Sequence, residues 1–289
     1  MKFMKVFITG VSGQLGYDVA KTLDARGIEY VGISSKELNI CDKGAVMTAL
    51  VDYAPDVVVH CAAYTKVDLA EDEPEKCWNV NVDGTRNIAE ACRQLSAKMV
   101  YISTDYVFPG EGDKPYEVDD PVRPLNTYGR SKLAGELVVQ SFLEKYFIVR
   151  TSWVIGQHGS NFVKTMLKLA ETHKEIKVVD DQIGSPTFTM DLAPLLCDMV
   201  MTEKYGVYHA TNEGYCSWAE LACAVFKAAD TDIRVIPVTT VEYGKSKAER
   251  PLNSRLSKRK LVENSFNSMM GWRETLKMYL YKAWENVHP

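Results

Sequence analysis

Short apolar runs alternate with amphipathic stretches in the first half of the chain, and this alternation restricts the fold more than any other feature. The apolar runs cover residues 5–9, 29–34, 57–61, 99–103 and 146–150. Helical spacing occurs between them, at residues 15–25, 42–53, 74–95 and 128–144. Strands that are apolar at nearly every position are covered on both faces, which is typical of a parallel sheet between two helical layers. The pattern therefore predicts an α/β fold with a doubly wound parallel sheet.

The rhythm changes after residue 150. Polar loops at 156–160 and 180–187 interrupt helical stretches at 162–172 and 191–201. A length of 289 residues is enough for two lobes that share an interface. We expect residues 1–155 with 186–204 to form the sheet domain. Residues 156–185 with 205–289 are expected to form a smaller, interrupted C-terminal lobe that binds substrate.

Composition excludes several classes of partner. The net charge of −4 offers no broad basic surface for nucleic acid, and no apolar stretch is long enough to span a bilayer. The seven cysteines are scattered singly without a CxxC pair, a pattern typical of free thiols in a reducing compartment. We therefore expect a cytoplasmic protein with neither a nucleic-acid nor a membrane partner.

A glycine-rich loop joins the first strand to the first helix. Glycines there permit a tight turn and let backbone N–H groups approach a pyrophosphate, whose charge the helix N-terminus favours. A strand precedes this loop and a helix follows it, as a Rossmann dinucleotide site requires. The candidate cofactor-binding residues of the loop are Gly10, Val11, Ser12, Gly13, Gln14, Leu15 and Gly16.

The end of the second strand indicates which nicotinamide cofactor is bound. An acidic residue at this place would bind the ribose of NAD, but the chain has Ser34, Ser35 and Lys36, with no carboxylate before Glu37. Hydroxyls and an ammonium suit a 2′-phosphate, which favours NADP(H), with NAD(H) as a second cofactor that the pattern allows. A solvated Lys36 without any ligand is the alternative interpretation.

Tyr128 and Lys132 are four residues apart and lie on one face of a predicted helix. Lowering the pKa of a tyrosine from about 10 to neutrality takes roughly 4 kcal/mol, and one ammonium at about 4 Å supplies roughly that amount at an effective dielectric of about 20. We therefore expect Lys132 to lower the pKa of Tyr128 and make it a general acid. Thr104, just past the fourth apolar run, is expected to hydrogen-bond the substrate oxygen.

These residues resemble the extended short-chain dehydrogenase/reductases, and more narrowly the dTDP-4-dehydrorhamnose reductases. The glycine loop and the YxxxK pair are shared across the superfamily, whereas three other segments are more specific. Those segments are STDYVF from Ser103, RTSW from Arg150 and DQIGSPT from Asp181.

The resemblance implies a reaction and a set of roles. The reaction is the NADPH-dependent reduction of the C4 ketone of a dTDP-linked 4-keto-6-deoxy sugar, dTDP-4-dehydro-L-rhamnose, to dTDP-L-rhamnose, a nucleotide sugar for cell-surface polysaccharide. Tyr128 would donate the proton, Lys132 would also hold the nicotinamide ribose, and Thr104 would contact the substrate.

Further binding residues follow from the same resemblance. Asn39 and Ile40 would flank the adenine. The nicotinamide side of the cleft would be lined by Cys61, Ala62, Ala63 and Tyr64. The substrate would be contacted by Asp105, Tyr106, Trp153 and Arg250, the last at the nucleotide phosphates.

Two alternatives and the assembly state stay open. Some members of the family dimerise through magnesium bound by a glutamate, but this chain has Leu15 at the matching place, so we predict no metal. The protein is expected to be a monomer or a homodimer. A non-catalytic regulatory subunit of the methionine adenosyltransferase type also resembles this family, but would not need Thr104, Tyr128 and Lys132 together. A nucleotide-sugar epimerase is the second alternative.

Overall fold

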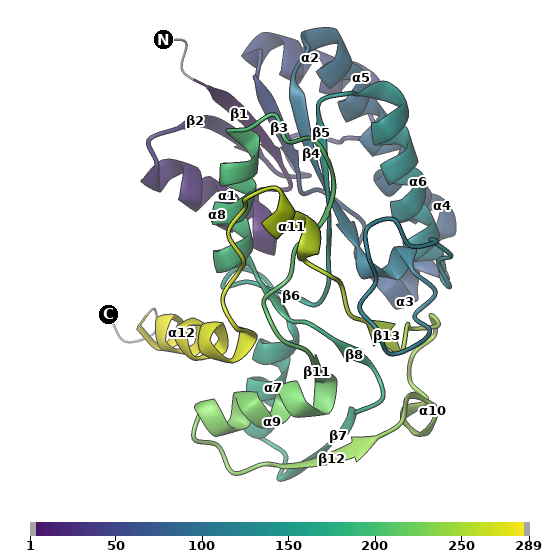
Figure 1. The fold of residues 1–289 in the computed structure, drawn as a ribbon, viewed down its shortest axis with the longest axis vertical. Coiled ribbons are helices and arrows are strands. Elements are labelled where there is room, and N and C mark those ends of the chain that lie inside the picture. The colour runs from purple at the N-terminus through teal and green to yellow at the C-terminus, as the bar shows by residue number, and fades with distance from the viewer. Residues whose placement is uncertain (1–3, 286–289) are drawn as a thin grey trace.

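The computed structural model describes residues 4–285 and contains a six-stranded sheet at its centre (Figure 1). The strand order is β10-β5-β4-β3-β1-β2, and every neighbouring pair is parallel. The strands are β1 (Lys5–Thr9), β2 (Glu29–Ile33), β3 (Val57–His60), β4 (Lys98–Thr104), β5 (Tyr146–Thr151) and β10 (Gly206–His209). The predicted doubly wound α/β fold is confirmed.

Helices cover both faces of this sheet. One layer is formed by α1 (Gln14–Ala25) and α8 (Thr189–Val200), and the other by α2 (Lys43–Tyr53), α5 (Thr85–Leu95) and α6 (Thr127–Phe142). Successive strand residues point to opposite faces, so Val6 and Ile8 pack beneath α1 and α8 while Phe7 packs beneath α2. Both faces are therefore apolar, which explains the continuous apolar runs of the sequence.

The expected helix at residues 74–95 is divided into three parts. It begins as α4 (Pro74–Trp78), widens into a π-helix over Asn79–Gly84 and continues as α5. Within the wide turn, Asn81 accepts a hydrogen bond from the backbone N–H of Tyr64 at 2.8 Å and donates to the Ser131 hydroxyl at 2.9 Å. The extra residue in the turn thus joins this helix to the loop after β3 and to α6.

The second lobe, below the sheet in Figure 1, has its own apolar core around Phe188, Leu221 and Trp272. Its helices are α7 (Phe162–Ala170), α9 (Trp218–Ala228), α10 (Thr240–Tyr243) and α12 (Trp272–Glu285). Its strands are β6 (Val154–Ile155), β7 (Glu175–Val179), β8 (Ile183–Gly184), β9 (Thr187–Phe188), β11 (Cys216–Ser217), β12 (Arg234–Val238) and β13 (Asn253–Ser254). The expected polar loop at 180–187 therefore contains short strands.

Residues from 205 onward were expected in the second lobe, but the chain returns to the large sheet at this point. β10 pairs with β5 as an edge strand of the large sheet, and α11 (Arg259–Glu263) packs against it through Leu261. The run at 206–209 is too short to be distinguished from a loop in the sequence. Two short elements remain, namely α3 (Val67–Ala70) and a 3₁₀ turn at Asp105–Val107. None of the helices in residues 4–285 is long and apolar enough to cross a membrane.

A buried ion pair joins α6 to the centre of the sheet. The Arg150 guanidinium donates from Nε to Oε1 of Glu136 at 2.9 Å and from Nη2 to Oε2 at 2.7 Å. Ser103 donates to the same carboxylate at 2.5 Å, and Arg150 also donates to the carbonyl of Val118 at 3.0 Å. Only 6% of the Arg150 side chain and 2% of the Glu136 side chain are exposed.

Glu136→Gln should lower the free energy of unfolding by about 3–5 kcal/mol, because it leaves the Arg150 cation buried without its counter-ion. Denaturant unfolding of the purified variant measures this change. Asp198→Asn is the matched control, since 32% of its partner Arg26 and 48% of Asp198 itself are exposed, and it should cost under about 1 kcal/mol. Equal losses in the two variants would contradict the prediction.

Candidate active site

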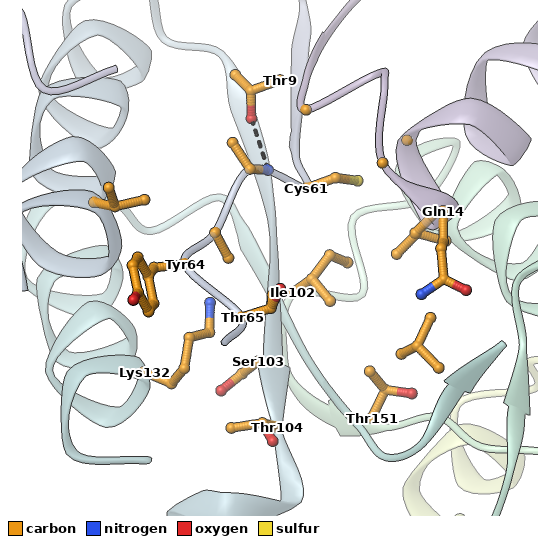
Figure 2. A pocket seen from close by; sticks show the side chains of 18 of the residues that line it. Thr9, Gln14, Cys61, Tyr64, Thr65, Ile102, Ser103, Thr104, Lys132 and Thr151 are labelled. Atoms are coloured by element: carbon orange, nitrogen blue, oxygen red, sulfur yellow. Dashed lines mark hydrogen bonds between the residues drawn. The ribbon is translucent and has the colours of Figure 1, made fainter. Parts of the chain in front are cut away.

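A pocket of about 740 Å³ lies beyond the carboxyl ends of the strands, where the two lobes meet. Figure 2 shows Lys132 reaching from α6 toward the end of β4, with Ser103 and Thr104 beside it and Gln14 on the opposite side. Parallel sheets of this type bind their ligands at this edge. The predicted site residues that line the pocket are Gly10, Ser12, Gly13, Gln14, Leu15, Gly16, Ser34, Ser35, Asn39, Ile40, Cys61, Ala62, Ala63, Tyr64, Thr104, Asp105, Tyr106, Tyr128, Lys132 and Trp153.

Three predicted residues lie outside the lining. Val11 packs against the core beneath Gly32, and Lys36 is exposed on the loop after β2. Arg250 lies behind Tyr106, whose hydroxyl accepts from Nη1 at 2.9 Å, while Nη2 donates to Asp68 at 2.6 Å. The guanidinium is therefore engaged by this chain's own side chains.

Several lining residues were not predicted. They are Thr9, Ile33, Leu38, Thr65, Val67, Val80, Ile102, Ser103, Thr151, Ser152, Val154, Ser160, Asn161 and Trp218. Thr9 and Thr151 end apolar strands and Ser103 is the penultimate residue of β4, and these positions are a signal that could have identified them. Trp218 comes from the second lobe, where it stacks on Trp153 with ring centroids 3.7 Å apart.

The glycine loop is shaped by close backbone contacts. Gly10 has a φ of +72°, and a Cβ there would lie 2.7 Å from the backbone nitrogen of Ala62. A Cβ at Gly16 would lie 2.3 Å from the carbonyl oxygen of Gly10. Gly13 begins α1 without a side-chain cap, and the first turn carries no acidic residue. The residues present therefore fit a dinucleotide pyrophosphate at this helix N-terminus.

The side chain of Gln14 connects this loop to the second lobe. Its Oε1 accepts from the backbone N–H of Gly156 at 2.7 Å and from Nδ2 of Asn161 at 3.2 Å. Asn161 also donates to the carbonyl of Gly156 at 2.7 Å. Gln14 therefore fixes the loop at 156–161 beside the glycine loop, so that both lobes form the wall of the pocket.

Thr104, Tyr128 and Lys132 come together at the end of β4. The Thr104 hydroxyl donates to Oδ1 of Asp105 at 3.0 Å and accepts from the backbone N–H of Tyr106 at 3.2 Å. The rings of Tyr106 and Tyr128 meet edge to face with centroids 5.7 Å apart. Lys132 is 2% exposed, and its ammonium lies 3.9 Å from the centroid of the Tyr101 ring.

Burial controls the protonation of this group. It raises the pKa of Tyr128 well above its usual value, and the nearby Asp105 carboxylate raises it further. Burial also lowers the pKa of Lys132 to about 7, although the Glu136 carboxylate opposes that change. The pKa of Tyr128 is therefore shifted away from neutrality, opposite to the expected direction, because loss of solvation is the largest cause of the shift. Tyr128 keeps its proton at neutral pH, as a proton donor must.

Thiols and acidic groups add no further site. Among residues 4–285 all seven cysteines are free, and no group of three or more His, Cys, Asp or Glu side chains is arranged to hold a metal ion. The absence of a metal stays a prediction.

Comparison with known proteins identifies the family. The family model described as the RmlD substrate binding domain matches residues 4–284. The spore coat polysaccharide biosynthesis protein SpsK of Bacillus subtilis is 44% identical, and the match covers 96% of each chain. A dTDP-4-dehydrorhamnose reductase of Streptomyces griseus is 40% identical over 93% of this chain and 90% of that one.

A solved structure gives the same result. The crystal structure of dTDP-4-dehydrorhamnose reductase from Bacillus anthracis in complex with NADP has a TM-score of 0.95 and 42% identity, covering 97% of this chain and all of that one, 100%. With nearly complete coverage in sequence and in structure, the chain belongs to the RmlD substrate binding domain family.

Proposed function

We propose that the protein uses NADPH to reduce the C4 ketone of dTDP-4-dehydro-L-rhamnose, giving dTDP-L-rhamnose. One observation carries the proposal: a single pocket contains both an uncapped helix N-terminus behind a glycine loop and a half-buried tyrosine with its buried lysine. The reductases of Streptomyces griseus and Bacillus anthracis support the choice of substrate, since this chain matches both over at least 93% of its length.

The residues of the pocket divide the work by position. Gly10 and Gly13 would hold the pyrophosphate, Ser34 and Ser35 the adenosine ribose, and Lys132 the nicotinamide ribose. When bound, the cofactor would supply the hydride. The Tyr128 hydroxyl would give its proton to the carbonyl oxygen as charge develops there.

Neighbours of Tyr128 would orient the ketone. The Thr104 hydroxyl donates to Asp105 and accepts from the backbone of Tyr106, so it would turn its proton from Asp105 to the ketone oxygen when substrate binds. Burial raises the pKa of Asp105 to about 6, so this carboxyl is mostly ionised at neutral pH. Its negative charge keeps the proton on Tyr128 until an oxyanion is forming beside it.

The stacked pair of Trp153 and Trp218 would form the wall for the sugar. Trp153 has a φ of +48°, a strained conformation for a bulky residue. Gly184 leaves room for the Trp153 indole, because a Cβ at position 184 would lie 3.0 Å from it. A flat aromatic wall suits the apolar face of a 6-deoxy sugar, whose methyl group would lose solvation against it.

Reaction products separate this proposal from its alternatives. Purified protein is mixed with NADPH and the dTDP-keto sugar, and the product is identified. Stoichiometric NADPH consumption with formation of dTDP-L-rhamnose is expected. A keto product without net NADPH consumption would indicate an epimerase instead. No turnover combined with tight binding to a partner enzyme would favour a regulatory subunit. The cytoplasmic location and the monomeric or dimeric state stay predictions.

Tyr128→Phe should lower turnover by at least about 10²-fold, because the ring stays in place while the proton donor is lost. Its Kd for NADPH should change little. Stopped-flow NADPH oxidation and a cofactor titration measure the two quantities. Tyr205→Phe serves as the control, since Tyr205 precedes β10 at the opposite end of the sheet. Near-normal turnover of the Tyr128 variant would remove this residue from its proposed role.

The pH dependence should follow Lys132. A lysine is charged below its pKa, so a pKa of about 7 means that the charge is lost as the pH rises through neutrality. We expect kcat/KM to fall by about tenfold per pH unit on the alkaline side. Lys132→Arg keeps a charge throughout and should abolish this decline, even at reduced turnover. An unchanged alkaline decline in that variant would show that another group titrates.

A further inference from the structure

The side-chain carboxylate of Glu37 closes the loop after β2. In the sequence, Glu37 follows the residues that are expected to contact the ribose. Oε2 of Glu37 accepts from the backbone N–H of Ser34 at 2.8 Å and from its hydroxyl at 2.7 Å. The backbone N–H of Glu37 donates in turn to the carbonyl of Ser34 at 3.1 Å. The side chain thus folds back over the turn, and its negative charge lies at the end of β2.

This turn forms one end of the cofactor pocket. Ser34 and Ser35 line the pocket, whereas Glu37 stands directly behind Ser34 at the distance of one hydrogen bond. In dinucleotide-binding folds, the end of this strand meets the adenosine ribose. A carboxylate there accepts a hydrogen bond from a ribose 2′-hydroxyl but repels a 2′-phosphate.

The bonds of Ser34 reduce what the turn can offer to a phosphate. Both of its donors are directed at Glu37, so neither is available to a phosphate oxygen unless the carboxylate moves. The same two donors lower the pKa of Glu37, which is therefore ionised at neutral pH. Lys36 is exposed beside it, and within residues 4–285 no ion pair of Lys36 is formed. Its ammonium thus remains as the attractive partner for a phosphate.

We propose that Glu37 is a specificity-determining residue that restrains the preference for NADPH and keeps NADH usable. It does so by holding the donors of Ser34 and by setting a negative charge against the 2′-phosphate, in opposition to Lys36. This inference rests on the proposed nicotinamide site and adds the residue that decides between the two cofactors.

A second turn in the chain provides a matched control. Oε2 of Glu242 accepts from the backbone N–H of Thr239 at 2.8 Å and from its hydroxyl at 3.0 Å, the same arrangement three residues apart. That turn begins α10 in the second lobe, far from β2 in Figure 1, and does not line the pocket. Removing its charge changes an equivalent turn without touching the cofactor.

The test compares Glu37→Gln with Glu242→Gln. Glutamine keeps an oxygen that accepts from Ser34, so the turn is retained while the charge is lost. Kd values for NADPH and NADH are measured by titration without any sugar nucleotide, at low and at high salt. We expect Glu37→Gln to raise the ratio of NADPH to NADH affinity by about fivefold to tenfold at low salt, and by less at high salt. Glu242→Gln should leave the ratio unchanged.

Two results would overturn the proposal. These are an unchanged ratio in Glu37→Gln, which includes an equal loss of affinity for both cofactors, and an equal shift in the Glu242 control. Because the titration contains no sugar, its outcome is independent of the reaction catalysed. Normal cofactor binding without ketone reduction would contradict the proposed function and leave the role of Glu37 standing.

Discussion

The buried pair of Glu136 and Arg150 is the interaction on which the catalytic end of the sheet depends. Taking two charges out of water costs several kcal/mol, and only good geometry with further hydrogen bonds offsets that cost. Here both guanidinium bonds are short, Ser103 adds a third donor to the carboxylate, and the carbonyl of Val118 accepts from the arginine. The pair therefore fixes α6 relative to β4 and β5. Tyr128 and Lys132 belong to that helix and Thr104 ends β4, so the ion pair helps to set the relative position of all three.

The same low-polarity surroundings determine the chemistry. Loss of solvation on burial disfavours the charged form of each group. It therefore raises the pKa of Tyr128, which keeps its proton, and lowers the pKa of Lys132 to near neutrality. Glu136 opposes the loss of charge at Lys132, and this gives the ion pair an electrostatic role as well as a mechanical one. A tyrosine with a raised pKa is a poor donor to water but a suitable one to an oxyanion that forms beside it.

The sequence predicted the sheet domain well because its signals are local. Apolar strands, a glycine loop and a capping residue such as Asp42, which accepts from the backbone of Ala45, each act within a few residues. Most of the candidate site could be predicted for the same reason, since strand ends meet at one edge. The failures concern distant partners. Arg250 was expected at a ligand, yet it binds Asp68 and Tyr106, nearly two hundred positions and more than one hundred positions away along the chain. β10 joins a sheet whose other strands end by Thr151, and a four-residue run carries too little pattern to show it.

The second lobe shows why such contacts matter for function. Gln14 begins the helix behind the glycine loop, yet its side chain bonds to Gly156 and Asn161 of the other lobe. The loop that is predicted to bind the pyrophosphate therefore also connects the two lobes. Trp153 follows β5, and its strained backbone directs the indole onto Trp218 of α9. Each lobe thus contributes one wall, and contacts made by the cofactor-binding loop itself set the distance between the walls. Any change that loosens Gln14 should consequently affect sugar and cofactor together, because its side chain holds the loop at 156–161 of the second lobe beside the glycine loop.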